Sequence, residues 1–279
     1  MPRLGTLNTP NPYAFFGAFA GLPFWPGGLT LLAAAPGIGK TSWMLQINFD
    51  AAAHSISSAM GCYEHTAEEL RYRLEKQSQA AVAGPHNAAL SEDTADHLAQ
   101  SSEMGILALS DQDDTIRAIE ETLLHDYGFP VYGPAILSVD YLQRVPVVGI
   151  TGILPEELRA GEAAATLRKL ARKRNWAIIV AAALRSESFE GGESLGDLLG
   201  DERVPYEADQ VILMRRDGPV HACGCVMLDV NTLKDRTGPK RSWIMEFWGE
   251  RFYSAGETDA HRWHITGDRP LQLPGEDDQ

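Results

Sequence analysis

The sequence has very few cysteines, no long apolar run and too few basic residues to balance its acids. Three cysteines in 279 residues exclude a disulfide framework, and Cys223 and Cys225 have no further Cys or His cluster nearby to complete a zinc site. No apolar run approaches the roughly 20 residues that span a bilayer, and the N-terminus lacks the apolar core of a signal peptide. We therefore expect a protein of the reducing cytoplasm with no membrane partner. Lys and Arg number 24 against 38 Asp and Glu, which argues against nonspecific coating of nucleic acid.

Strand and helix patterns alternate along most of the chain. GLTLLAAA, PAILSVD and WAIIVAAAL are apolar runs of strand length, and helical patterns lie between them. This alternation predicts an α/β fold with a mostly parallel, twisted sheet flanked by helices on both faces. CVMLDVNTL, RSWIMEFW and RFYSA predict antiparallel strands at the C-terminal end. The Asp pair that opens DDTIRAIEETLLH is predicted to cap a helix.

The two ends of the chain differ in composition from this core. Residues 1–12 are rich in Pro and Asn and predict a flexible N-terminal arm, and residues 13–254 predict one domain. Residues 255–279 are polar and acidic and predict a disordered tail. Residues 83–104 predict an excursion from the core with a short helix.

A phosphate-binding loop follows the first predicted strand. The stretch from Ala34 to Thr41 reads G-x-x-x-x-G-K-[ST], with Ala34 in place of the first Gly. In such a loop backbone N–H groups surround phosphate oxygens, Lys40 reaches the β- and γ-phosphates, and Thr41 holds Mg²⁺. A plain Gly-rich turn is the alternative, but the strand–loop–helix context favours a nucleotide site. The predicted nucleotide-binding residues are Pro36, Gly37, Ile38, Gly39, Lys40, Thr41 and Ser42.

Two acids at the ends of predicted strands complete this site. Asp140 ends PAILSVD, where it would hold the metal together with Thr41. Glu64 ends SSAMGCYE at the same sheet edge, where a carboxylate would orient the attacking water. The alternatives are a strand-ending Asp in a turn and an acid in the first turn of the following helix. For Glu64, spacing alone does not decide between them.

Five sequence blocks, in order, resemble the RecA-like ATPase domain of DnaB-type replicative helicases. They cover roughly Tyr13 to Ser254 and read AAAPGIGKTS, CYEHTAEELRYRL, SVDYLQ, LGDLLGDERVPYEADQVILMRRD and LKDRTGP. The resemblance implies a RecA-like P-loop NTPase core, ATP and Mg²⁺ as cofactors, and Glu64 as the catalytic glutamate beside Lys40. It also implies a ring hexamer or filament with ATP sites between subunits. The work implied is DNA replication, recombination or mobile-element maintenance, with single-stranded DNA and other replication or mobile-element proteins as partners.

The stretch NTLKDRTGPKRSW places four cations within eight residues of a chain whose net charge is −14. By resemblance, Lys234 and Arg236 contact the γ-phosphate held by a neighbouring subunit, and Arg236 acts as an arginine finger. Read alone, the stretch favours a solvated basic hairpin, and only the other four blocks favour the role in a neighbouring site. Lys240 and Arg241 receive no role.

Several departures from that family keep other functions open. Ala183 stands where the family has a Gln that senses the γ-phosphate, and Arg185 is a hypothetical substitute. The loops expected to contact DNA are Val145–Glu157 and Ser186–Glu202, and the second holds six acids and no base. We expect a stand-alone ATPase domain without the separate N-terminal domain that this family has. The alternatives are an ATP-dependent oligomeric switch, assembly or defence protein without DNA translocation, and a strand-annealing recombination protein.

Two further groups receive structural interpretations. The basic residues from Arg168 to Arg174 suit the C-terminal end of a solvated helix. The aromatic residues near the C-terminus, Phe247 and Phe252 among them, are predicted to fill core and strand-edge positions instead of stacking on bases.

Overall fold

The computed structural model describes residues 24–83, 104–149, 152–154, 156–189, 194–221 and 224–255. The predicted arm, the first residues of the predicted domain and the predicted excursion after residue 83 lie outside the described residues. The predicted tail also lies outside them, apart from Ala255, which is the last residue of a strand.

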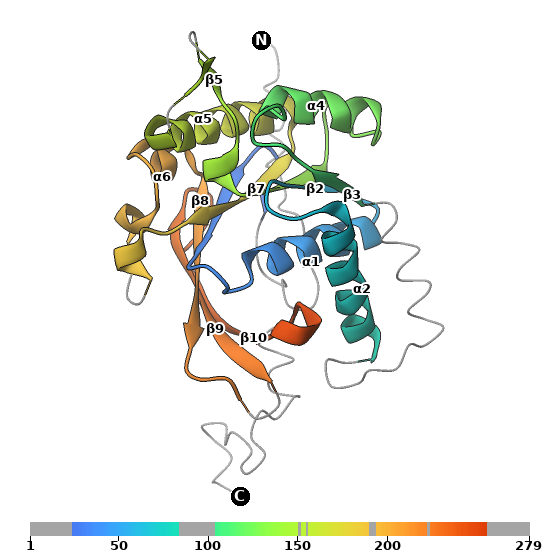
Figure 1. Cartoon of the computed structure of the whole chain (residues 1–279), viewed down its shortest axis with the longest axis vertical. Helices are drawn as coiled ribbons and strands as arrows, with labels where there is room; N and C mark the ends of the chain where they lie inside the picture. The colour runs from blue at the N-terminus through green and yellow to red at the C-terminus, as the bar shows by residue number, and fades with distance from the viewer. Residues whose placement is uncertain are drawn as a thin grey trace, which may run out of the picture.

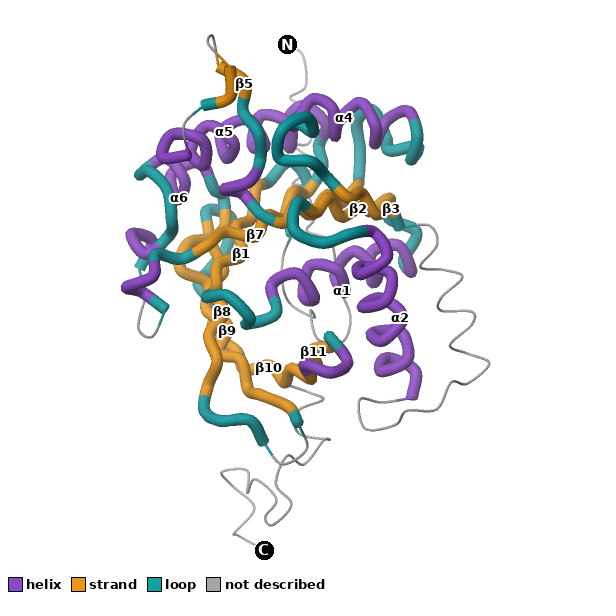
Figure 2. Tube along the Cα trace, viewed as in Figure 1, coloured by secondary structure: helices purple, strands orange, loops and turns teal. Residues whose placement is uncertain are grey.

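One nine-stranded sheet forms the centre of the fold, in the order β11-β10-β9-β8-β1-β7-β4-β2-β3 (Figures 1 and 2). The strands are β1 Leu29–Ala34, β2 Ser57–Cys62, β3 Gly105–Ala108, β4 Ala135–Asp140, β7 Ala177–Ala183, β8 Gln210–Asp217, β9 Cys225–Asp235, β10 Ser242–Trp248 and β11 Tyr253–Ala255. From β3 to β8 every pairing is parallel, whereas β8, β9, β10 and β11 pair antiparallel. The predicted α/β class and its antiparallel C-terminal end are confirmed.

Helices cover both faces of the parallel part of the sheet. In Figure 1, α1 (Lys40–Ala53) and α2 (Ala67–Ala83) lie on one side, and α4 (Ile116–His125) and α5 (Glu156–Arg174) lie on the other. Burial on both faces explains why β1 and β4 are unbroken runs of buried, mostly apolar residues. Two core clusters follow from this arrangement, one on each side of the sheet. None of the helices described here is long and apolar enough to cross a membrane.

The cap of α4 differs from the sequence prediction. Thr115, not the preceding Asp pair, is the N-cap, and its hydroxyl oxygen accepts a hydrogen bond from the backbone N–H of Ala118 at 3.3 Å. The carboxylate of Asp114 instead accepts a hydrogen bond from the backbone N–H of Ser110 at 2.6 Å. An Asp and a Thr that are adjacent in sequence are both good caps, so the loop geometry decides which one caps the helix.

The parallel strands all point the same way, which brings their C-terminal ends to one edge of the sheet. The ends of β1, β7, β4 and β2 are neighbours there, because Ala34 pairs with Ala183 and Cys62 pairs with Asp140. Ligands in open α/β sheets bind outside this edge. A short hairpin of β5 (Val148–Gly149) and β6 (Gly152–Ile153) follows β4.

Candidate active site

The loop between β1 and α1 is shaped by two glycines in the left-handed region. Gly37 has φ +78° and Gly39 has φ +105°, conformations that L side chains rarely adopt. A Cβ on Gly39 would also lie 2.9 Å from Cζ of Phe247, whereas none of the described atoms comes within 4 Å of a Cβ on Gly37. The loop therefore curls tightly against β10 at the start of α1, which is where backbone N–H groups bind anions.

Lys40 lies inside this loop. Its Nζ donates to the backbone oxygens of Ala34 at 2.9 Å and Ala35 at 3.2 Å. Burial lowers the pKa of the Lys40 ammonium, and the nearby charges of Asp140 and Glu64 oppose that shift. The side chain thus presents a desolvated cation at the centre of the loop, as phosphate binding requires.

Thr41 and Asp140 meet across the site. The Thr41 hydroxyl donates to the Asp140 carboxylate at 2.5 Å, and Asp140 is 1% exposed. Burial raises the pKa of this carboxyl group, and the hydrogen bond from Thr41 opposes the rise. A hydroxyl and a carboxylate side by side are hard oxygen donors, which is the ligand type that Mg²⁺ prefers. These residues fit the metal predicted from the sequence.

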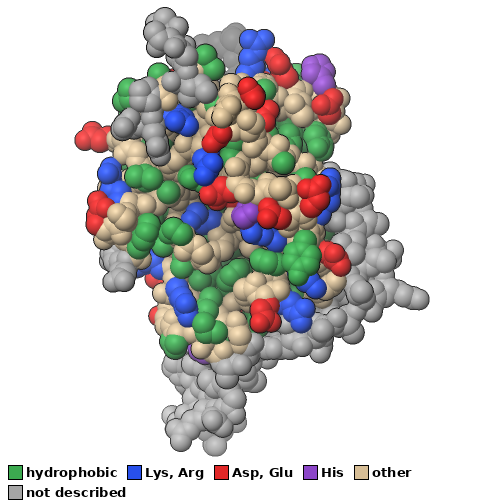
Figure 3. Space-filling view, viewed as in Figure 1, with side chains coloured by type: hydrophobic (Ala, Val, Ile, Leu, Met, Phe, Trp, Pro, Cys, Tyr) green, Lys and Arg blue, Asp and Glu red, His purple; other side chains and the backbone are tan. Residues whose placement is uncertain are grey.

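A cavity of about 460 Å³ joins these groups at the sheet edge. Glu64 lies on its wall and is exposed, two residues beyond the end of β2. Figure 3 shows acidic, basic and hydrophobic side chains interspersed over the pictured face of the molecule. Ile38 is the one predicted nucleotide-binding residue that the cavity lining does not include, and it packs against the core. The predicted residues that do line the cavity are Pro36, Gly37, Gly39, Lys40, Thr41, Ser42, Glu64 and Asp140.

An amide side chain lies beside Ala183 despite the missing Gln. Gln143 lines the cavity, its Oε1 accepts a hydrogen bond from the backbone N–H of Ala183 at 3.2 Å, and its Nε2 donates to Leu199 O at 2.8 Å. Arg185 does not substitute for the Gln, because it donates to the backbone oxygens of Gly196 and Gly200. Gln143 lies in the sequence block SVDYLQ, three residues after its Asp, and that proximity is the one signal in the sequence that points to it.

Two aromatic residues form cavity wall where the sequence suggested core or strand edge. Phe247 and Phe252 both line the cavity, and the guanidinium of Arg73 lies 5.2 Å from the Phe252 ring centroid. Phe247 is 7% exposed, so it also belongs to the core. Only tertiary packing brings the C-terminal strands against the loop, and no local pattern in the sequence indicates it.

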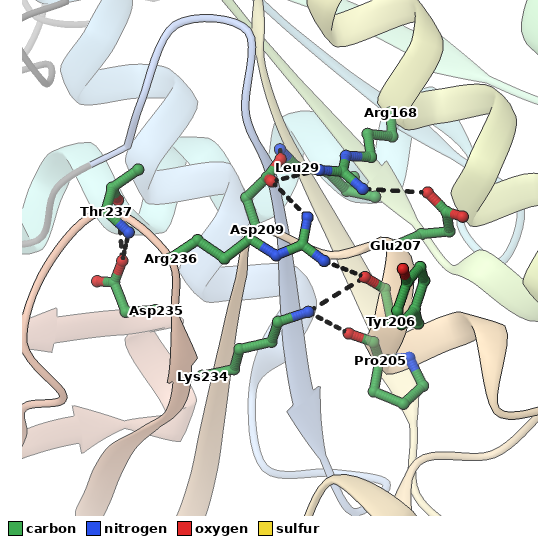
Figure 4. A network of polar contacts seen from close by, with 10 residues as sticks. All are labelled: Leu29, Arg168, Pro205, Tyr206, Glu207, Asp209, Lys234, Asp235, Arg236 and Thr237. Carbon is green, nitrogen blue, oxygen red and sulfur yellow. Dashed lines mark hydrogen bonds and ion pairs between the residues drawn. The ribbon is translucent and has the colours of Figure 1, made fainter.

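Lys234 and Arg236 lie outside this cavity and contact their own chain (Figure 4). Lys234 Nζ donates to the backbone oxygens of Pro205 at 2.6 Å and Tyr206 at 3.2 Å. Arg236 donates to the Asp209 carboxylate at 3.2 Å and to Tyr206 O at 2.7 Å. The two cations therefore point the same way, toward α6 (Arg203–Glu207) and the start of β8.

The basic end of α5 is less solvated than the sequence suggested. Arg168 has a side chain only 13% exposed, and it bridges Glu207 at 3.3 Å and Asp209 at 2.9 Å. Arg174 is paired with Glu120 in the same manner. The interpretation as a plain solvated helix end is wrong for these two arginines, because the last turns of α5 face α4 and α6.

Comparison with known proteins agrees with this arrangement. The family model described as DnaB-like helicase C terminal domain matches residues 19–253. The chain belongs to the DnaB-like helicase C-terminal domain family. A solved structure whose title names it as an ATPase domain superposes with a TM-score of 0.67 at 19% identity, covering 83% of this chain and 85% of that one. A structure of a DnaB-like replicative helicase and its interactions with primase superposes with a TM-score of 0.69 at 19% sequence identity, covering 84% of this chain and 58% of that one.

The comparison with curated proteins gives no match. Both structural neighbours share the RecA-like DnaB fold with this chain. Membership in the DnaB-like family supports a helicase or ATPase function that uses nucleotide and Mg²⁺ in an oligomer.

Proposed function

We propose that this DnaB-like domain binds Mg·ATP at the β1–α1 loop and hydrolyses it between subunits of a ring or filament. The observation that carries the proposal is the separation of the loop from the basic pair Lys234 and Arg236 along a single strand. Lys40 Nζ contacts Ala34, the last residue of β1. The basic pair lies at the other end of β1, beside its first residue, Leu29. There the backbone N–H of Arg236 donates to Asp209 O, and the backbone N–H of Asp209 donates to Leu29 O.

The length of β1 prevents the β1–α1 loop and the basic pair of one subunit, the two halves of the proposed site, from acting on the same nucleotide. Five residue steps from Leu29 to Ala34 at 3.3 Å each span about 17 Å. A side chain at one end of β1 does not reach a phosphate at the other. A head-to-tail contact between copies would bring one subunit's cations to the next subunit's loop, and such heterologous contacts close into rings or extend as filaments.

Each residue then has a role in phosphoryl transfer. Lys40 and the loop backbone would bind the phosphates, and Thr41 with Asp140 would hold the metal, which would supply charge neutralisation at the phosphate oxygens. Glu64 orients the attacking water from the cavity wall. Arg236, with Lys234 beside it, stabilises the charge that spreads over the transferred group, an effect worth roughly 10³–10⁵ in rate for arginine fingers.

We propose single-stranded DNA as the polymer on which this ATPase acts, in replication, recombination or mobile-element maintenance. A second candidate, an oligomeric ATP-dependent switch without translocation, is favoured by one observation. In the loop after β7, Asp197 is engaged by Ser188 and Ser194, and Arg185 bonds backbone oxygens of the same loop. These groups are satisfied within the loop, and its acids repel DNA phosphates.

The test measures ATP hydrolysis by the full chain with and without single-stranded DNA at low salt. Arg236→Ala is expected to lower kcat at least 100-fold, and Lys240→Ala, an exposed cation in the same turn, to leave it unchanged. Stimulation by DNA supports the helicase proposal. An ATPase that neither binds DNA nor responds to it supports the switch. A normal rate for Arg236→Ala would refute catalysis in trans.

A further inference from the structure

Asp209 contacts β1, α5 and Arg236, and both its backbone and its carboxylate are held by hydrogen bonds. It stands at the entry to β8, where its backbone N–H donates to Leu29 O at 2.8 Å and its carbonyl accepts from Arg236 N at 3.0 Å. One carboxylate oxygen accepts a hydrogen bond from Leu29 N at 3.1 Å. The other is paired with Arg168 at 2.9 Å and Arg236 at 3.2 Å (Figure 4).

From this geometry we infer that Asp209 is the positioning residue for Arg236, and that Arg168 tunes how strongly Asp209 holds it. The inference rests on the proposed function, because it names what aims the arginine that acts in trans. Asp209 itself is assigned no contact with nucleotide or metal.

Charge sharing explains why Arg236 is held without being neutralised. Three cations, Arg168, Lys234 and Arg236, gather around two carboxylates, Glu207 and Asp209, so the cluster keeps one unbalanced positive charge while Lys234 is protonated. Because Arg168 takes part of the Asp209 charge, Arg236 keeps attraction for an incoming phosphate. The side chain of Asp209 is 18% exposed, so this pairing is only partly screened by water.

Hydrogen-bond geometry leaves Arg236 equipped for a second ligand. Within the described part of the chain, its guanidinium uses two N–H groups, one on Asp209 and one on Tyr206 O. A guanidinium has five N–H donors, and a phosphate takes two in a bidentate contact. Its side chain is 33% exposed, so the remaining edge is accessible to a neighbouring copy. Because the guanidinium is planar, the two hydrogen bonds to Asp209 and Tyr206 O fix the direction in which its remaining N–H groups point.

The size of the expected loss of kcat follows from how strongly the rate of phosphoryl transfer depends on the position of the arginine. A misplacement of about 1 Å costs on the order of 100-fold in rate. Asp209→Asn keeps the shape and one acceptor oxygen but removes the charge that holds Arg236. We expect kcat to fall about 10- to 100-fold, less than the loss on deleting Arg236 itself. Nucleotide affinity is expected to stay within about twofold, because the β1–α1 loop is untouched.

The experiment uses purified full-length variants and reads hydrolysis, binding of a fluorescent ATP analogue and subunit mixing. Glu120→Gln is the matched control, since Glu120 is a carboxylate 13% exposed that also bridges two cations, Lys173 and Arg174, away from the cluster. Glu120→Gln should leave kcat unchanged. Asp209→Asn should regain activity when mixed with Lys40→Ala, which supplies an intact Arg236. It should gain none when mixed with Arg236→Ala, because both defects lie in the same half-site.

Three results would overturn the inference: a wild-type kcat for Asp209→Asn, a kcat above wild type, or no recovery with Lys40→Ala while Arg236→Ala does recover with it. The last pattern would mean a defect in the variant's own fold. If Arg236→Ala hydrolyses ATP normally, the proposed function fails instead, and the two failures are thus distinguishable. Should the Asn variant not fold, Asp209→Glu displaces the carboxylate by one methylene and is expected to lower kcat about tenfold; a wild-type kcat there counts against the inference equally.

Discussion

Substituting Gly39 by Ala tests how the C-terminal strands shape the β1–α1 loop. Gly39 has φ +105°, and an added Cβ would lie 2.9 Å from Cζ of Phe247 on β10. Gly37, with φ +78°, has open space around the same added atom among the described residues. Gly37→Ala therefore carries the backbone strain alone, and Gly39→Ala carries the strain plus the clash.

The expected free energies separate these two effects. A non-Gly residue in the left-handed region costs about 1–2 kcal/mol, and overpacking a core contact costs about 1–3 kcal/mol more. Gly37→Ala should thus lower the free energy of unfolding by about 1–2 kcal/mol and Gly39→Ala by about 2–5 kcal/mol.

Urea unfolding with equal m-values measures the difference. In a Phe247→Leu background, where the ring is gone, the extra cost of Gly39→Ala should shrink toward that of Gly37→Ala. If Gly39→Ala is no more destabilised than Gly37→Ala, the contact between β10 and the loop is not as described.

Two further predictions follow from other contacts. Burial, with the charges of Arg236 and Arg168, lowers the pKa of Lys234 to about 8, so the ammonium is charged below that pH and neutral above it. We therefore expect kcat to fall as the pH rises through about 8. Lys234→Arg, which stays charged at this pH, should abolish the fall. The Gln46 side chain hydrogen-bonds both the N–H and the C=O of Ser254 at 2.9 Å. Gln46→Ala should leave these two buried backbone groups without their partner and lower the free energy of unfolding, measured with urea, by about 2–4 kcal/mol. A loss below about 1 kcal/mol would contradict this prediction.

Local sequence patterns predicted the strands, the helices and the loop because their causes are local. Unbroken apolar runs require burial on both faces, and glycines followed by Lys and Thr at the start of a helix have few uses other than phosphate binding. Asp140 and Glu64 followed from the rule that parallel strands end at one edge. The structure places all these residues around one cavity. Their chemical roles stay a prediction.

The interpretations that failed depend on side-chain direction across the fold. Arg185 turns to backbone oxygens of its own loop, and Arg168 turns inward to two carboxylates on the β8 side of the sheet. Phe252 did not fail its interpretation as a core or strand-edge residue, but it also lines the cavity, because β11 returns to α1. None of these directions is encoded in periodicity or motif spacing, since the contacts of Arg168 and Phe252 join distant parts of the chain and that of Arg185 depends on how its loop folds back.

The most direct test of catalysis between subunits is to mix two inactive variants. Lys40→Ala removes the phosphate-binding lysine at one end of β1, and Arg236→Ala removes the cation at the other end. In an equal mixture that exchanges freely, about a quarter of head-to-tail interfaces pair an intact loop with an intact Arg236. We predict that hydrolysis rises toward about a quarter of the wild-type rate. A rate that remains at the average of the two separate variants, in mixtures shown to co-assemble, would contradict an active site shared between subunits.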